Sequence, residues 1–586
     1  MFSCRSPLRE QQIPTRLAQP LLPASYLLYL LSAFPPQPQP PTNWHEKNAQ
    51  PIPQSPQPSA LAVLLFSLPT PSRLLFLLNF AINTLLLAAS ADLAISPFFD
   101  TAPDVAFTRV GAVYPDSVKL LVRHPYPNDS LAVLYREQSN SSLPWKPGPT
   151  LNLTEHSDWA QTVRLAGLWP STSYEYVIAD SNRTALDRPI PFRTFPDPRL
   201  HAPSFFRFLA TSCITPNFPY AGPFHRRTIP GFDHLADYLY AVNHTQSPIE
   251  FLLFLGDFIY ADVPTYIGDD QEAYRRLYRR NYASPSFRKV YEQLPIIFAY
   301  DDHEFINNYG GNSLDLPPFA NASNAYHIYA GSTNYDAHEN YYDFQHGDIA
   351  FFVMDTRRYR SPPNTTVEPK TMLGPTQLAA LHAWLHRVNT THPAPFKFIV
   401  SSVPFTSLWT HDAQIDSWAG YADEKAALLA AFHSVPNLIV ISGDRHEFGA
   451  VEFAVRDGDP GYVVREFSTS PLSMFYIPFV HTMRERSEAF FTRNVTEGVE
   501  EVPYEKRIAY IPTGNVKWSA FEVDTRDIDK PTLRLETVID GKPAYHLEIV
   551  GTPVYPPAAL SGLSSLVTTN VKGIFDRIGL RPSKWF

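Results

Sequence analysis

Six apolar runs that end in polar clusters constrain the fold of this chain more than any other feature. They are FFRFLATSC, IEFLLFLGDFIY, LPIIFAYDDHE, DIAFFVMDTRRYR, FKFIVSSVPF and NLIVISGDRHEF. The segments between them, such as QEAYRRLYRRNYASPSFRKVYEQ, GPTQLAALHAWLHRVN and DEKAALLAAFHSV, have the spacing of amphipathic helices. Buried strands that alternate with helices predict an α/β domain, in which ligands bind beyond the carboxyl ends of the strands.

A different pattern precedes this domain, from about Val105 to Pro196. Stretches such as SVKLLVRH, LAVLYRE and WAQTVRLAGLWPSTSYEYVIAD alternate apolar and polar residues between turns rich in Pro, Asn and Ser. The phrase VRLAGLWPSTSYEYVI resembles the end of a fibronectin type III-like sandwich. We therefore predict an all-β fibronectin type III-like module, a type that more often positions other domains than catalyses.

The N-terminal part of the chain is predicted to be a leader. Its Pro/Gln-rich segment, PPQPQPPTNWHEKNAQPIPQSPQPS, should stay extended. The uncharged stretch from Leu74 to Ala91 is about long enough to cross a bilayer as a helix. Arginines precede it, which favours a signal anchor with a cytosolic N-terminus and a lumenal or extracellular body. The alternatives are a late, cleaved signal sequence or a signal peptide that begins near Arg73.

Glycosylation sequons favour the same location. Asn-X-Ser/Thr sequences without a central proline begin at Asn128, Asn140, Asn152, Asn182, Asn243, Asn321, Asn364, Asn389 and Asn494. One sequon arises easily by chance, but nine of them, spread over the body of the chain, predict N-glycans and a place in the secretory pathway. The two cysteines, Cys4 and Cys213, lie in the leader and deep in the chain, so the sequence offers no disulfide framework.

These patterns divide the 586 residues into four predicted parts: a leader with a signal anchor (1–98), a β-sandwich (99–198), a catalytic domain (199–545) and a C-terminal extension (546–586). In the extension, LSGLSSLVTTNVKGIFDRIGL spaces its apolar residues as a helix does. The formal net charge of −9 and the lack of a long Lys/Arg block argue against nucleic acid as a binding partner.

Candidate metal ligands follow four of the predicted strands. They are Cys213, then Asp257 with Tyr260, then Asp302 with His303 and Glu304, and finally Asp444 with His446. Taken singly, each has an ordinary structural explanation, but four neighbouring strand ends with such residues are hard to attribute to turn chemistry. Carboxylates suit hard cations, imidazole suits iron and zinc, and phenolate and thiolate bind a trivalent ion strongly. The sequence therefore predicts a metal centre, which in a dimetal form would bind a phosphoryl group.

The same motifs carry a resemblance to a known family. The series ATSC…LGDFIYAD…YDDHEFINNYGG…VMDTRRYR…LGPTQLAALHAWL…VSSVPF…SGDRHEF…EFSTSPL resembles the alkaline phosphatase D, or PhoD-like, phosphatases, which are calcineurin-like metallophosphoesterases. The resemblance covers roughly Val105 to Asp540 and implies a β-sandwich ahead of a catalytic α/β metallophosphoesterase domain. It also implies hydrolysis of phosphate monoesters, diesters or both, by in-line attack of an activated oxygen on phosphorus.

The resemblance implies a set of metal ligands. The matching residues are Cys213, Asp257, Tyr260, Asp302, Asp444 and His446. The first three match the positions that hold Fe³⁺ in PhoD-like enzymes, and the last two match the late metal-binding motif. Calcium accompanies the iron in this family, so Fe³⁺ and Ca²⁺ are the implied cofactors.

Two further residues match catalytic positions. His303 lies where these phosphoesterases place a histidine near the leaving-group oxygen, and Arg357 is predicted to contact phosphate. Asn307, in HEFINN, is a further matching position. Where the family often has Trp before the Asp pair of DDHE, this chain has Tyr300, which changes a pocket wall and removes no ligand.

Some of these features also occur in proteins with two other functions. A purple acid phosphatase also has a Gly-Asp-x-x-Tyr motif, but it expects Gly-Asn-His and Gly-His-x-His where this chain has DDHE and GDRHEF. A catalytically silent, membrane-anchored binding protein would suit the sandwich, the sequons and the anchor. The complete ligand set argues against that second alternative.

Overall fold

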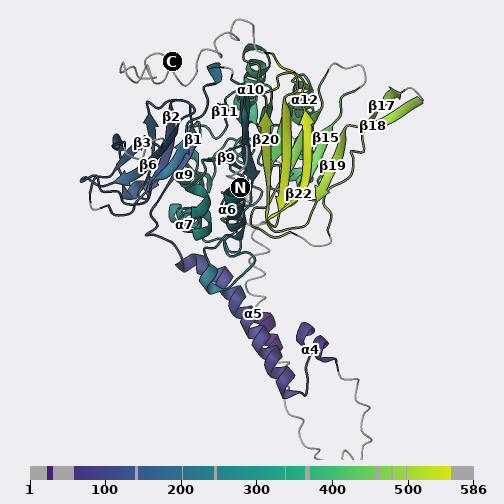
Figure 1. Ribbon diagram of the computed structural model, residues 1–586. Coiled ribbons are helices and arrows are strands. Elements are labelled where there is room, and N and C mark those ends of the chain that lie inside the picture. The colour runs from purple at the N-terminus through teal and green to yellow at the C-terminus, as the bar shows by residue number, and fades with distance from the viewer. Residues whose placement is uncertain are drawn as a thin grey trace, which may run out of the picture. The chain divides into compact units, whose positions relative to one another are not determined.

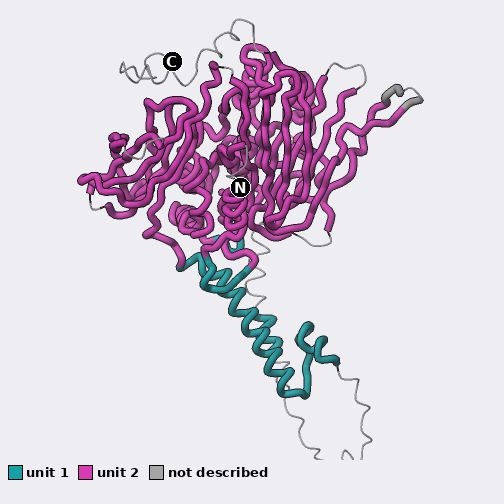
Figure 2. Tube along the Cα trace, viewed as in Figure 1, with its two compact units in different colours: residues 1–99, 220–226, 263–266 teal, residues 100–219, 227–262, 267–586 magenta. Residues whose placement is uncertain are grey.

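The computed structural model describes most of the chain (Figure 1). The described residues are 23–30, 58–127, 129–138, 143–200, 202–242, 247–336, 338–362, 370–456, 461–476, 480–495 and 498–555. The Pro/Gln-rich segment, apart from its last residues, and the apolar C-terminal segment lie outside these ranges. The chain divides into two compact units, of which the first consists of residues 1–99, 220–226 and 263–266 and the second of the remainder (Figure 2).

The first unit contains the predicted membrane-spanning stretch. Its helices include α4 (Ala60–Phe66) and α5 (Arg73–Phe99). Among the described residues, α5 is the one helix that is long and apolar enough to cross a membrane, with a mean hydropathy of 2.0 in its most apolar part. Length and composition alone support this, and a signal sequence near the N-terminus has the same properties.

The second unit begins with two small antiparallel sheets. Their strands are β1 (Phe107–Val113), β2 (Ser117–Arg123), β3 (Ala132–Glu137), β4 (Lys146–Thr150), β5 (Ala160–Ala166), β6 (Ser173–Ala179) and β7 (Ile190–Arg193). One sheet has the order β1-β2-β5 and the other the order β4-β3-β6-β7. Apolar residues from both sheets, such as Leu120 and Tyr176, belong to one buried cluster.

Two larger mixed sheets follow. The first has the order β10-β9-β8-β20-β21-β22, with strands β8 (Phe205–Thr211), β9 (Ile249–Phe254), β10 (Ile296–Phe298), β20 (Lys517–Asp524), β21 (Thr532–Ile539) and β22 (Lys542–Val550). The second has the order β11-β12-β13-β14-β16-β15-β19, with strands β11 (Tyr342–His346), β12 (Ile349–Val353), β13 (Lys397–Val400), β14 (Leu438–Ser442), β15 (Phe448–Phe453), β16 (Val464–Thr469) and β19 (Glu505–Ile511). A two-stranded sheet pairs β17 (Phe490–Val495) with β18 (Gly498–Pro503). Strands β8, β9 and β10 are parallel to one another, as are β12, β13, β14 and β16.

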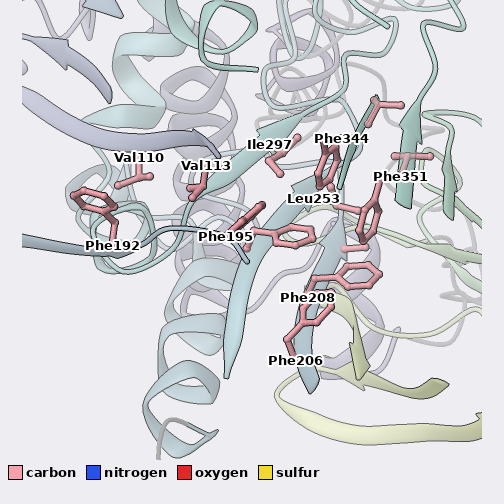
Figure 3. Close-up of a cluster of buried hydrophobic side chains, with 14 of the residues drawn as sticks. Val110, Val113, Phe192, Phe195, Phe206, Phe208, Leu253, Ile297, Phe344 and Phe351 are labelled. Atoms are coloured by element: carbon pink, nitrogen blue, oxygen red, sulfur yellow. The ribbon is translucent and has the colours of Figure 1, made fainter. Parts of the chain in front are cut away.

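Phenylalanines join the two large sheets (Figure 3). The ring of Phe208 on β8 lies 5.2 Å from that of Phe351 on β12 and 5.0 Å from that of Phe398 on β13. The same buried cluster extends to Val110 and Phe192 of the small sheets, so one apolar core runs through this unit. Burial of such large aromatic side chains dominates the energetics of a core of this kind.

Helices pack against both large sheets. The described α-helices of this unit are α6 (Pro230–Val242), α7 (Gln271–Tyr282), α8 (Pro285–Tyr291), α9 (Phe319–Tyr329), α10 (Gly374–His386), α11 (Ala413–Asp416) and α12 (Ala422–His433). Phe352 follows Phe351 on β12, points to the opposite face and packs against Trp384 of α10, with ring centroids 5.6 Å apart. On the other sheet, Tyr238 of α6 packs against Trp518 at 5.5 Å. The predicted α/β architecture of mixed sheets and helices is therefore confirmed.

Candidate metal centre

The predicted ligands all follow strands of the two large sheets. Cys213 follows β8, Asp257 follows β9, Asp302 follows β10 and His446 follows β14. The first two loops are bonded together, because the backbone N–H of Cys213 donates to the carbonyl of Gly256 at 3.1 Å. Since β8, β9 and β10 are parallel, their carboxyl ends meet at one edge of the sheet.

Unusual backbone conformations aim these ligands. Cys213, Asp257, Asp444 and His446 have positive φ angles of 61°, 57°, 72° and 56°. Such conformations cost about 1–3 kcal/mol for residues other than glycine and concentrate at functional sites. Gly256, with φ 115°, could not be replaced without movement, because an added Cβ would lie 2.5 Å from the Cβ of Asp301. The close approach of the loop after β9 to the loop after β10 therefore depends on glycine at position 256.

The side chains form three overlapping groups in which ligand atoms lie within 4.8 Å of one another. The groups are Cys213, Asp257 and His446; Asp257, Asp302 and His303; and Asp257, Asp301, Asp302 and Asp444. Asp257 belongs to all three. Its Oδ2 lies 3.4 Å from the sulfur of Cys213 and accepts a hydrogen bond of 3.1 Å from Tyr260, whose hydroxyl also lies 3.0 Å from Nε2 of His446.

The donor set fits a metal. Asp257 Oδ1 and Asp301 Oδ2 are buried and have no hydrogen-bond partner within the described part of the chain. Burial and neighbouring carboxylates raise the pKa of Asp257, and burial, outweighing Arg445, raises the pKa of Asp444 to about 8. Burial and the nearby His303 lower the pKa of His446 to about 3, which leaves a neutral imidazole able to bind a metal. A bound cation would satisfy the orphaned oxygens and favour the charged carboxylates.

His303 is held beside this cluster. Its Nδ1 lies 2.6 Å from Oδ1 of Asp262, and its ring packs on that of Tyr260 with centroids 4.2 Å apart. Burial would lower the pKa of His303, but Asp262, Asp302 and Asp257 outweigh burial and raise it well above its ordinary value. These carboxylates therefore favour the protonated form of His303.

Arg357 is fully buried within carboxylates. Its guanidinium bonds to Asp301, lies 3.3 Å from Oδ1 of Asp302, and donates to both oxygens of Asp416 at 3.0 and 2.9 Å. Arg357 and Asp301 each have at most 1% of the side chain exposed. The contact with phosphate that the sequence predicts stays a prediction, and the structure adds contacts that orient two carboxylates of the cluster.

Comparisons with known proteins decide the family. A family model described as PhoD-like phosphatase matches residues 210–510, slightly more than half of the chain. The chain belongs to the PhoD-like phosphatase family. It is therefore a hydrolase of phosphate esters, and the interpretation as a silent binding protein is set aside.

Two solved structures share the fold of this PhoD-like phosphatase. The structure of PhoD aligns with a TM-score of 0.51 and 15% identity, over 82% of this chain and 99% of PhoD. Purple acid phosphatase PPD1 from yellow lupin (Lupinus luteus) seeds aligns with a TM-score of 0.52 and 14% identity, over 76% of this chain and 75% of that one. At such identities the likeness shows the fold alone. A comparison with curated proteins finds no match.

Three acidic residues around the PhoD-like site received no role from the sequence: Asp262, Asp301 and Asp416. Glu304, which the sequence grouped with the candidate metal ligands, instead binds backbone N–H groups. Glu304 accepts hydrogen bonds from the backbone N–H groups of Asp257, Phe258 and Asp301, at 3.0, 2.6 and 2.7 Å, and so ties the second and third loops together. Asp301 lies in the quoted DDHE motif and Asp262 ends LGDFIYAD, so position in a motif could have indicated them. Asp416 had no such signal.

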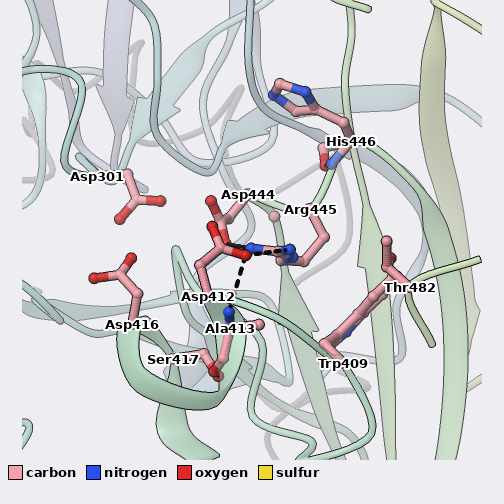
Figure 4. Close-up of polar contacts among 12 residues, drawn as sticks. Asp301, Trp409, Asp412, Ala413, Asp416, Ser417, Asp444, Arg445, His446 and Thr482 are labelled. Atoms are coloured by element: carbon pink, nitrogen blue, oxygen red, sulfur yellow. Dashed lines mark hydrogen bonds and ion pairs between the residues drawn. The ribbon is translucent and has the colours of Figure 1, made fainter. Parts of the chain in front are cut away.

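Arg445 lies between Asp444 and Asp412 (Figure 4). Its Nη2 donates to Oδ1 of Asp412 at 2.9 Å, and its Nη1 lies 3.7 Å from Oδ2 of Asp444. The Asp412 side chain is 59% exposed, and that of Arg445 is 13% exposed. Arg445 is therefore a cation next to the proposed ligand Asp444 that retains some access to solvent, unlike Arg357.

Tyr300, at the position where the family often has Trp, is part of the buried framework. Its hydroxyl donates to Oδ2 of Asp355 at 2.7 Å. Oδ1 of Asp355 accepts the backbone N–H groups of Arg357 and Arg358, each at 3.0 Å. Tyr300 thus supports the segment that carries Arg357.

Proposed function

We propose that this PhoD-like phosphatase hydrolyses phosphate monoesters, diesters or both at a dimetal or multimetal centre. The proposed metal ligands are Cys213, Asp257, Tyr260, Asp302, Asp444 and His446. One observation carries the proposal: Asp257 belongs to all three groups of potential ligands. One of its buried oxygens also has no partner in the described structure. A shared carboxylate of this kind is what a centre with two closely spaced metals needs.

Fe³⁺ and Ca²⁺ are the proposed metals. The contacts among Cys213, Tyr260 and His446 bring together thiol, phenol and imidazole groups, which suit iron. The group with four carboxylates supplies the oxygen ligands that calcium prefers. When bound, the metals neutralise the phosphoryl oxygens and lower the pKa of an attacking water.

The protein residues supply positioning and a proton. Because Asp262 accepts from Nδ1 of His303, the other ring nitrogen, Nε2, is available to protonate the departing alkoxide. Glu304 fixes the loop of Asp257 relative to the loop of Asp301, because it accepts backbone N–H groups from both. We propose that Arg445, and Arg357 as the sequence predicts, provide positive charge for the phosphate group.

His303→Gln is expected to lower kcat by about 10²–10⁴-fold for alkyl phosphates, which have poor leaving groups. The loss should be much smaller for p-nitrophenyl phosphate, because its leaving group departs without a proton. Steady-state kinetics with both substrates measure the difference, and His327→Gln on α9 is the control. Equal losses on both substrates would show that His303 does not act as the general acid.

The function itself is tested on the purified, glycosylated protein. We expect it to contain iron and calcium, to turn over p-nitrophenyl phosphate or its diester analogue, and to lose that turnover on chelation and regain it with metal. The iron-loaded form is expected to absorb visible light through a Tyr260-to-iron charge-transfer band that Tyr260→Phe lacks. An enzyme that is fully active without metal would contradict the proposal, and a colourless, iron-replete enzyme would contradict the role of Tyr260.

The location of the enzyme is proposed from the leader and the sequons. We propose a secretory-pathway protein whose α5 anchors it in a membrane, with the catalytic body on the lumenal or extracellular side. Of the predicted glycosylation sites, Asn152 and Asn182 have exposed side chains, which is compatible with attached glycans.

We also propose that residues 99–198 form the fibronectin type III-like module predicted from the sequence. Three strands in one sheet and four in the other support this. So does Tyr174 at the start of β6, whose hydroxyl accepts the backbone N–H of Trp169 at 2.9 Å, the tyrosine-corner contact of such sandwiches.

A further inference from the structure

The end of the apolar stretch in α5 is tied to a loop that lies much later in the sequence. Asp92 is the first charged residue after Leu74–Ala91. Its carboxylate accepts hydrogen bonds from Nε of Arg226 at 2.9 Å and from the hydroxyl of Tyr220 at 3.1 Å. The loop of residues 220–226 therefore belongs to the same compact unit as α5, as do residues 263–266 (Figure 2).

This unit exposes large apolar side chains beyond the uncharged stretch. They are Ile95, Phe98, Phe99, Phe224 and Val263, which we call the collar. Phe224, in the short helix Pro223–His225, is 97% exposed, and Phe99 is 78% exposed. One exposed apolar residue is ordinary, but five in one small unit form a pattern: three lie at the carboxyl end of α5 and two in the loops grouped with it.

We propose that the collar rests in the interface of the bilayer that α5 enters, with Phe224 inserted among the lipid headgroups. The inference rests on the proposed anchor. Segments that lie in the membrane interface bury Trp, Phe and Leu side chains at the boundary between headgroups and acyl chains, and burial of one Phe side chain there removes apolar area from water. The ion pair of Asp92 with Arg226 neutralises the first charge beyond the span, so the loop can lie close to the lipid without an unpaired charge.

The sequence makes a lipid surface a better occupant than a protein partner. The collar follows the uncharged stretch Leu74–Ala91, and its two loops are separate short segments rather than a continuous groove. Both loops come from the part of the chain matched by the phosphatase family: Tyr220 follows Cys213 by a few residues, and Val263 directly follows Asp262. Two loops from the family-matched part of the chain, residues 220–226 and 263–266, would then contact the bilayer in addition to α5.

The test uses the full chain with Cys4→Ser, reconstituted in phosphatidylcholine–phosphatidylserine vesicles. Phe224→Cys is labelled with the polarity-sensitive fluorophore NBD, and Phe490→Cys on β17, also an exposed Phe, is the matched control. Cys213 is buried and should not react. We expect the label at position 224 to shift to the blue in vesicles and to be quenched by lipids with spin labels near the headgroup, and the label at position 490 to do neither. Turnover of p-nitrophenyl phosphate in detergent should be unchanged in both variants.

Each other outcome overturns the inference. Equal quenching at the two positions would mean that position 224 has no special contact with lipid. A blue shift without lipid quenching would assign the collar to a protein contact, such as a second copy of the chain. Vesicle flotation after an alkaline wash is measured first. A chain that does not float lacks the membrane anchor. A chain that floats but shows no lipid quenching at position 224 has the anchor and disproves only the membrane contact of the collar.

Discussion

Asp257→Asn is expected to remove bound metal and phosphatase activity together while leaving the fold intact. Asparagine has nearly the same shape and tolerates the positive φ of 57° at this position, but it cannot supply a shared, charged ligand. Loss of the several kcal/mol that metal ions contribute to the transition state corresponds to roughly a thousandfold loss of kcat/KM. Metal analysis and steady-state kinetics of the purified variant measure both effects.

Although Asp257→Asn lowers activity, it should raise the stability of the metal-free protein. Burial raises the pKa of Asp257 in the folded state, so its carboxylate opposes folding at pH values above its ordinary pKa, about 3.9. As the pH rises from 4 to 7, the chelated wild type should therefore lose stability relative to chelated Asp257→Asn. Added metal should raise the Tm of the wild type and leave that of the variant unchanged, because only the wild type binds it.

Asp348→Asn provides the control for this prediction. Asp348 is also an acid whose pKa is raised by burial, but it bonds to Thr525, away from the three groups of potential ligands. This variant should keep its metal and its activity. If Asp257→Asn keeps both as well, the proposed centre is wrong.

The sequence predicted the meeting of four strand ends because the information there is local. An apolar run indicates a buried strand, and the residue that follows it lies at the edge of a sheet. Cys213, Asp257 and His446 could be brought together by this argument alone, and the structure places their ligand atoms within 4.8 Å of one another. The motif DDHE similarly indicated that one tight loop would present several polar side chains.

Contacts between distant segments could not be predicted in this way. Asp416 lies 59 residues beyond Arg357 on the short helix α11, and nothing in its neighbourhood marks it as an ion-pair partner. The segment from Gln271 to Gln293 reads as one amphipathic helix, yet the structure has two, because Pro285 begins α8 and Ser284 caps it. Tertiary packing and capping decided both cases.

Arg357→Met is expected to lower the free energy of unfolding of the metal-free enzyme by about 3–5 kcal/mol, the usual cost of removing one partner from a buried ion pair. Methionine replaces much of the apolar volume of the side chain but leaves Asp301 and Asp302 without their cation. Asp416 keeps Arg360, so the loss falls mainly on the two carboxylates of the cluster. Urea unfolding at equilibrium measures the change.

The neighbouring Arg358→Met is the matched control, because Arg358 pairs with Asp315 at the surface and such pairs contribute only about 0–1 kcal/mol. Arg357 could contact phosphate directly, or it could only orient the carboxylates of Asp301 and Asp302. Inhibition by inorganic phosphate, measured at saturating metal, distinguishes these two roles. If Arg357 only orients carboxylates, phosphate should inhibit the metal-loaded variant as well as the wild type. A variant with unchanged stability and weakened phosphate inhibition would instead establish the direct phosphate contact, and then the side chain must leave its carboxylate partners when substrate binds.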